Sequence, residues 1–172
     1  MLKTIGLCVM VISGAGFGMA LSGELSKRKR HLEMLLQMTI LLKGEIRYGN
    51  TSLYDAFTGA AGKLEGKYRE FFLNTAKKMQ VHRGENFGMI FRKTAKETLG
   101  DAGLTVQERE MLYSLGDRLG YLGMDMQLKQ LELMEKELEY SLRELQKDLP
   151  ERKKIRQSMG ILLGIFLAVL AA

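Results

Sequence analysis

The sequence predicts an all-α fold: a membrane-anchored bundle of about six helices with an N-terminal and a C-terminal transmembrane helix. Charge is confined to the middle of the chain. All 20 acidic residues lie between Glu24 and Glu151, and of the 26 basic residues only Lys3 lies outside 27–156. Both ends are apolar, and apolar residues between them recur at helical spacing without strand-like alternation. The predicted regions are a transmembrane helix at 1–23, a helical domain at 24–157 and a second transmembrane helix at 158–172.

The first region contains an uncharged run of 20 residues, Thr4 to Gly23. As a helix this run is roughly 30 Å long, which matches the hydrocarbon core of a bilayer. A cleaved signal peptide is the alternative, with Lys3 before the run and Gly18-Met19-Ala20 as a cleavage site. The run is long for a signal peptide, and a basic cluster follows it directly. These features favour an uncleaved transmembrane helix.

The middle region reads as six helices separated by glycine-containing breaks. Gly49-Asn50 stops the first helix, and Ser52–Asp55 and Thr105–Glu108 resemble capping boxes that open two others. Pro150 is expected to end the last helix and turn the chain toward the membrane. The helices are expected at about 25–48, 52–61, 68–81, 87–99, 105–122 and 124–149. Most are too short to be stable alone, so they are expected to pack together.

The C-terminal run, Ser158 to Ala172, has 15 uncharged residues. It is roughly 22 Å long as a helix, and it spans a bilayer only if Arg156 snorkels or the bilayer thins. A buried helix and a re-entrant hairpin arm are the alternatives. Both apolar runs contain a Gly-x-x-x-Gly spacing, at Gly14 and Gly160, which suits helix contacts but is also common in membrane helices.

Basic clusters follow the first apolar run and precede the second. They contain Lys27, Arg28, Lys29, Arg30, Lys153, Lys154 and Arg156. Because positively charged flanks stay on the cytoplasmic side, both clusters place the middle domain in the cytoplasm. A nucleic-acid site is the alternative interpretation. Their position at two membrane edges, without interleaved aromatic residues, favours anionic lipid headgroups instead.

Groups that carry catalysis are scarce. The two histidines, His31 and His82, are expected to be solvated, and the single cysteine, Cys8, lies in the first apolar run. No spacing of His and Cys fits a metal site, and no phosphate loop or nucleophile elbow is present. We therefore predict a protein that is not an enzyme, with no catalytic, metal or cofactor site, no small-molecule substrate and no nucleic-acid partner.

Two motifs resemble the stage III sporulation protein AB family. Leu41 to Phe57 is similar to the signature E-I-x-Y-G-x-T-P-L-x-x-A, and Glu108 to Gln127 is similar to E-x-x-x-L-x-x-x-G-x-x-L-G-x-x-D-x-x-x-Q. Ser52 stands where the first signature has Pro, and Gly123 stands where the second has Asp. The family motif residues that we consider for interaction are Glu45, Tyr48, Gly49, Leu53, Gly116, Gly120 and Gln127.

The resemblance implies a sporulation protein in the mother-cell membrane around the forespore. It also implies that the soluble domain is similar to the inner-membrane platform proteins of type II secretion and type IV pili. By that similarity, the protein is a platform subunit of a secretion-like complex and docks a cytoplasmic secretion-type ATPase. The alternative is a membrane-surface adaptor that binds anionic lipid or other proteins through its basic flanks. For the Tyr48-Gly49 corner we favour a structural role, with Gly49 ending a helix and Tyr48 packing behind it, over a docking role.

Overall fold

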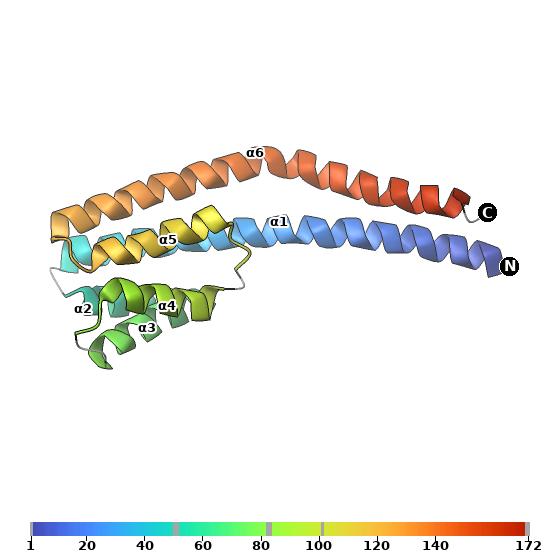
Figure 1. The fold of residues 1–172 in the computed structure, drawn as a ribbon. Coiled ribbons are helices and arrows are strands. Elements are labelled where there is room, and N and C mark those ends of the chain that lie inside the picture. The colour runs from blue at the N-terminus through green and yellow to red at the C-terminus, as the bar shows by residue number, and fades with distance from the viewer. Residues whose placement is uncertain (1, 50–51, 82–83, 101, 171–172) are drawn as a thin grey trace. The chain divides into compact units, whose positions relative to one another are not determined.

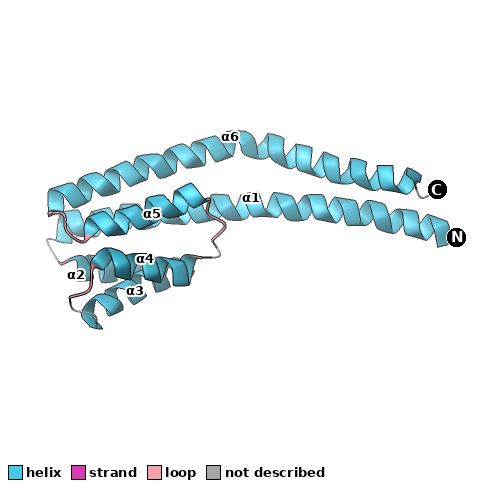
Figure 2. Cartoon of the chain, in the orientation of Figure 1, coloured by secondary structure: helices cyan, strands magenta, loops and turns pink. Residues whose placement is uncertain are grey.

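In a computed structural model, the described part of the chain forms six α-helices and no strand (Figures 1 and 2). The backbone is described for residues 2–49, 52–81, 84–100 and 102–170, and side chains for residues 23, 25–49, 52–81, 84–100, 102–147 and 158. The helices are α1 (Leu2–Gly49), α2 (Leu53–Ala61), α3 (Gly66–Val81), α4 (Phe87–Leu99), α5 (Val106–Leu119) and α6 (Met124–Leu170). The all-α prediction is confirmed.

The two terminal helices are longer than predicted. α1 has 48 residues and α6 has 47, so each continues without a break into the apolar run at its end of the chain. The sequence predicts separate transmembrane helices beside the six of the middle region. The apolar runs are instead extensions of the first and last of those six, because no residue between the segments interrupts the helical backbone.

Pro150 does not end the last helix, so that prediction is wrong. The backbone stays helical on both sides of Pro150, to Leu170. A proline inside a helix removes one backbone hydrogen bond and costs about 3 kcal/mol. Strong helix formers surround it, including Leu149, Glu151 and Lys153, and their propensity explains why the helix continues.

The chain divides into two compact units. One contains residues 1–29 and 143–172, and the other contains residues 30–142. The first unit therefore contains both ends of the chain, which carry the two apolar runs of the sequence. The boundaries predicted near residues 23 and 157 separate membrane-spanning from soluble segments. The division into compact units does not test them, so they stay predictions.

Phenylalanines form the centre of the second unit. α2 packs on α3, α3 on α4 and α4 on α5, and Phe57 of α2 lies in ring contact with Phe72, Phe87 and Phe91, at centroid distances of 4.7, 5.7 and 6.1 Å. Phe57 and Phe91 are fully buried. Tilted and edge-on ring pairs at these distances stabilise the core beyond simple burial. The short helices therefore depend on this shared core for their stability.

Both predicted helix starts are present. Thr105 forms a complete capping box with Glu108, in which the hydroxyl accepts from the Glu108 backbone N–H and the carboxylate accepts from the Thr105 N–H. Ser52 is the N-cap of α2, and its hydroxyl accepts from the Asp55 N–H at 3.3 Å. Ser52 has a φ of −60°, a value that Pro also adopts, and its side chain adds a capping oxygen that Pro lacks.

Candidate interaction surface

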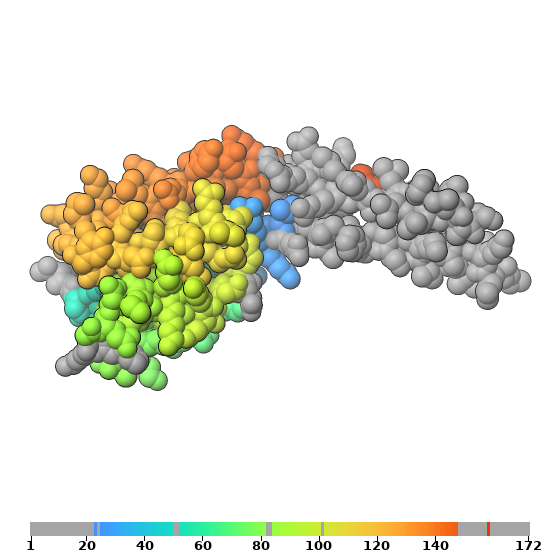
Figure 3. Space-filling view, viewed as in Figure 1, coloured from blue at the N-terminus to red at the C-terminus, as the bar shows by residue number. Residues whose placement is uncertain are grey.

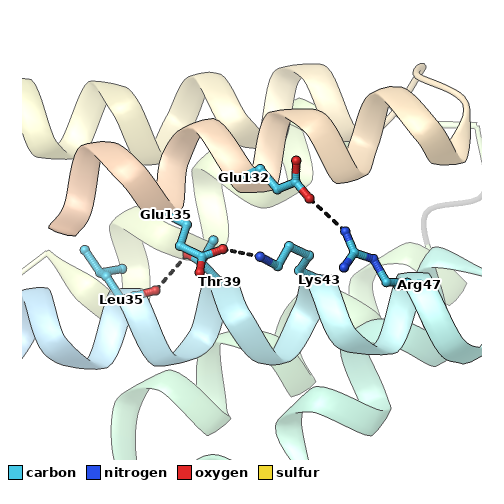
Figure 4. Close-up of polar contacts among 6 residues, drawn as sticks. All are labelled: Leu35, Thr39, Lys43, Arg47, Glu132 and Glu135. Atoms are coloured by element: carbon cyan, nitrogen blue, oxygen red, sulfur yellow. Dashed lines mark hydrogen bonds and ion pairs between the residues drawn. The ribbon is translucent and has the colours of Figure 1, made fainter. Parts of the chain in front are cut away.

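Two ion pairs hold α6 against α1 within the second unit (Figure 4). Lys43 of α1 pairs with Glu135 of α6, and one turn farther along α1, Arg47 donates to Glu132 at 2.7 Å. Moving forward on α1 means moving backward on α6, so the helices are antiparallel. The C-terminal end of α1 therefore lies beside the N-terminal part of α6, as Figure 1 also shows.

Glu45 of the first motif links α1 to α2. Its carboxylate accepts a hydrogen bond from Lys63 at 2.7 Å. It also lies over Gly59, where an added Cβ would sit 2.7 Å from a Glu45 oxygen. Glycine at this position lets the carboxylate pass close to the α2 backbone. Glu45 therefore supports the structure of the corner between these two helices.

Tyr48 does not pack behind the helix end, so the structural role that the sequence favoured for it is wrong. Its side chain is 83% exposed. Gly49 is the last residue of α1, as expected, and Leu53, the first residue of α2, is half-buried. Tyr48 follows Arg47 near the end of α1, and its side chain points into solvent. The docking role of this corner gains support.

Gly116 and Gly120 of the second motif bring α4 and α5 into close contact. A Cβ added to Gly116 would lie 2.3 Å from the Phe91 ring, and one added to Gly120 would lie 2.7 Å from Phe87 Cβ. The two glycines are one turn apart on the same face of α5 and its C-cap. Neither has a side chain, so both phenylalanines can lie directly against the α5 backbone. Gly88 of α4, which the sequence analysis did not single out, lies equally close to Asp117, with an added Cβ 2.8 Å from its Cα. The contact of Gly88 with α5 produces no periodic pattern in the sequence.

Gln127 closes the turn between α5 and α6. Its side-chain amide donates to the Leu119 carbonyl at 2.7 Å, and its backbone N–H donates to the Gly123 carbonyl at 2.9 Å. The side chain thereby satisfies a carbonyl at the end of α5 that has no partner within its own helix. Gly123, which stands where the second signature has Asp, is the last residue of this turn, and Asp125 is exposed.

Exposed apolar side chains remain at this end of the second unit. Tyr48, Tyr121 and Met124 are 83%, 74% and 46% exposed. They lie at the end of α1, in the α5–α6 turn and at the first residue of α6, and these three segments lie at the same end of the unit in Figure 1. We call these three residues the tip patch. The motif residues Glu45, Gly120 and Gln127 stabilise the corners that carry it.

His31 is not solvated as predicted. Its Nδ1 lies 2.9 Å from the Tyr68 hydroxyl, which itself donates to the His31 carbonyl at 3.1 Å. The pair joins α1 to α3. Burial raises the pKa of Tyr68 far above its usual range, so the phenol stays neutral. His82 lies outside the described residues.

We expect His31 to make stability depend on pH. Burial, together with the nearby cations Lys67 and Arg30, lowers the pKa of His31 below 6.5. The folded state therefore resists protonation more than the unfolded state does, so His31 contributes stability at neutral pH that is lost as pH falls below its ordinary pKa. Thermal unfolding of the full chain in detergent at about pH 7.5 and about pH 5.5 tests this. The loss of stability on acidification should be smaller in His31→Gln, and an equal loss in both proteins would contradict the prediction.

The predicted membrane-flanking residues are described only in part. Lys27 and Arg30 are exposed, and Arg28 and Lys29 are half-buried. The side chains of Lys153, Lys154 and Arg156 lie outside the described residues, as do nearly all those of the predicted spans at 4–23 and 158–172. Within the described residues, no helix is long and apolar enough to cross a membrane. In the same part of the chain, no group of three or more His, Cys, Asp or Glu residues is placed to hold a metal ion.

Comparison with protein families identifies a match over nearly the whole chain. The family model described as stage III sporulation protein AB matches residues 3–171. No curated protein and no solved structure matches the chain. The match covers nearly the whole chain, including both apolar runs and both motifs.

Proposed function

Because the chain belongs to the stage III sporulation protein AB family, which implies a role in sporulation, we propose that it is a membrane-anchored platform subunit of a secretion-like complex needed for endospore formation. In this proposal the apolar runs anchor the chain in the mother-cell membrane around the forespore, and the helical domain lies in the cytoplasm. The protein catalyses no reaction. It docks a cytoplasmic secretion-type ATPase and other proteins of the complex.

The tip patch is the observation that carries the docking role. Several family motif residues make contacts that stabilise the corners of the bundle: Glu45 with Lys63, Gly120 against Phe87, and Gln127 with the end of α5. Tyr48 is the motif residue whose side chain is mostly exposed. The end of α1 that carries it lies at the same end of the unit as the α5–α6 turn and the start of α6, which carry Tyr121 and Met124. Exposed tyrosines on a rigid frame are typical of binding surfaces, because they supply contact area at low conformational cost.

The membrane role is supported by the sequence of the two ends. Each run of 15 or more uncharged residues is bordered by basic residues on the side of the middle domain. Insertion in that orientation is what the distribution of positive charge favours. The grouping of both chain ends into one compact unit agrees with a pair of neighbouring membrane helices.

A binding assay tests the docking role. The full chain in detergent is immobilised and incubated with the secretion-type ATPase made by the same organism during sporulation. We expect Tyr48→Ser combined with Tyr121→Ser to weaken binding at least about tenfold, since loss of two aromatic anchors exceeds about 1.4 kcal/mol. Val81→Ser and Met89→Ser are matched controls, because both residues are 69% exposed and lie outside the tip patch.

Two outcomes would contradict the proposal. The first is no ATPase binding by the unchanged protein, together with normal assembly of the complex in cells that lack it. The second is equal binding by the tip-patch variant, with binding lost on charge reversal of Lys27 to Arg30 while membrane orientation is kept. That second outcome would favour the membrane-surface adaptor.

A further inference from the structure

We propose that the outer face of α6 is a contact between two copies of this chain, in which the two α6 helices pack in parallel. The contact is centred on Met126, Leu133 and Tyr140, which we call the α6 row. These residues are 46%, 45% and 62% exposed. They are large apolar side chains on a helix that also buries Leu131 and Leu138 against the bundle.

The spacing of the α6 row suits a second helix. Its members are seven residues apart, so they follow one face of the helix with a drift of only about 20° per repeat. The row is about 21 Å long. Single exposed apolar residues are normal on protein surfaces, but a row at heptad spacing supplies one of the two apolar positions per heptad through which one helix packs along another.

The charges beside the α6 row favour a second copy of this chain as the binding partner. They also favour one relative direction of the two α6 helices. Lys129 and Lys136 follow row members by three residues and lie on one side, whereas Gln130 and Glu137 follow by four and lie on the other. Within the described part of the chain, Lys129, Lys136 and Glu137 form no salt bridge.

Parallel pairing places the side of each α6 that carries Lys129 and Lys136 against the side of the other that carries Gln130 and Glu137. Lys136 of each copy then lies beside Glu137 of the other, so one symmetric contact forms two ion pairs next to Leu133. Antiparallel pairing brings Lys129 of one copy to Lys136 of the other, which is a repulsive arrangement. The row is therefore self-complementary in the parallel direction only.

A groove beside the row offers space for the partner's side chains. It lies between α5 and α6 and is lined by Met111, Leu115, Met134 and Glu137 among others; the two helices are neighbours on one face of the unit (Figure 3). In the parallel arrangement, Lys136 of the second copy reaches toward this side. Its aliphatic stem can cover the methionines while its ammonium group meets Glu137.

The predicted strength of this contact rests on the proposed membrane function. A row of three residues makes a small interface, below the area of stable soluble complexes. Confinement of two copies in one bilayer raises their effective concentration, and it also gives their helices the same direction. We therefore expect association in membranes and weak association in dilute detergent.

Cysteine cross-linking in isolated membranes tests the arrangement. In a Cys8→Ser background, Met126→Cys and Tyr140→Cys should each form a disulfide-linked dimer on oxidation, since parallel packing places equivalent residues together. Met89→Cys, which is 69% exposed on α4, is the matched control and should not. A preference for products between Met126→Cys chains and Tyr140→Cys chains would show antiparallel packing and overturn the proposal, as would yields no higher than that of the control.

A charge exchange tests the ion pairs separately. K136E and E137K each place like charges across the contact, so each alone should lower the cross-linking of Met126→Cys chains, with about a tenfold weaker association. Mixed dimers of the two variants regain both attractive pairs and should cross-link like the unchanged chain. Failure of the mixture to recover would overturn the parallel arrangement.

A photo-reactive residue at Leu133 identifies the occupant. A product of twice the mass of the chain supports the proposal, whereas a product that contains a different protein overturns it. Fractionation of the same cells reports membrane association independently. Loss of the dimer with membrane association retained contradicts this inference alone, and loss of membrane association contradicts the proposed function.

Discussion

Replacement of Gly116 by alanine should destabilise the helical domain by about 3 kcal/mol, although alanine is the better helix former. The added methyl group would lie 2.3 and 2.5 Å from two carbons of the Phe91 ring and 2.8 Å from its Cβ. Phe91 is fully buried between Phe57 and Phe71, so its ring cannot move aside without displacing other phenylalanines. α4 and α5 must then separate, which weakens the contact along its length.

Gly44→Ala is the matched control. Gly44 lies inside α1, and an added Cβ there meets no atom within 4 Å. The same substitution should therefore stabilise the protein by about 0.5–1 kcal/mol through helix propensity alone. Urea unfolding of the full chain in detergent, followed by circular dichroism, measures both. Equal effects at the two positions would show that close packing of α4 on α5 contributes little.

Reversal of the α1 charges that face α6 should cost about 2–3 kcal/mol of stability. In the double variant Lys43→Glu and Arg47→Glu, four carboxylates would face one another across the helix pair (Figure 4). The inner pair contributes most, because the Lys43 and Glu135 side chains are only 19% and 21% exposed, whereas those of Arg47 and Glu132 are 43% and 45% exposed. Solvent screening reduces the effect of the outer pair.

The complementary reversal provides the decisive comparison. Addition of Glu132→Lys and Glu135→Lys to the double variant exchanges the charges and should restore most of the lost stability. Lys147→Glu is the control, because Lys147 pairs with Glu144 one turn away on the same helix and is 75% exposed; we expect an effect within about 0.5 kcal/mol. If the exchanged variant stays as unstable as the double variant, the pairs do not determine how α6 lies on α1.

The helices themselves were predictable because their signals are local. Thr105 and Glu108 carry both halves of a capping box within four residues, and the apolar residues of each helix recur every three or four positions. Such patterns depend on the backbone geometry of one helix, which any sequence window contains. Two errors concern places where a helix continues. At Pro150 the helix passes a residue that usually ends it, and at the junctions with the apolar runs the change from charged to apolar residues does not end it.

The candidate site was predictable only in part. The motif residues were identified through the family resemblance, but the sequence favoured a packed Tyr48 and a solvated His31. Both outcomes depend on which distant residues surround the side chain. Tyr48 is left exposed at the end of α1, and His31 meets Tyr68, which is 37 residues away.

By itself, the sequence determined that this protein is helical, that its charge lies between two apolar ends, and which family it resembles. The tertiary structure decided that Gly116 and Gly120 receive phenylalanine rings, that Lys43 and Arg47 face α6, and that Tyr48 and the α6 row stay exposed. The reason is physical: helix periodicity is encoded over a few residues, whereas burial and charge pairing are set by segments distant in the chain that meet only after folding.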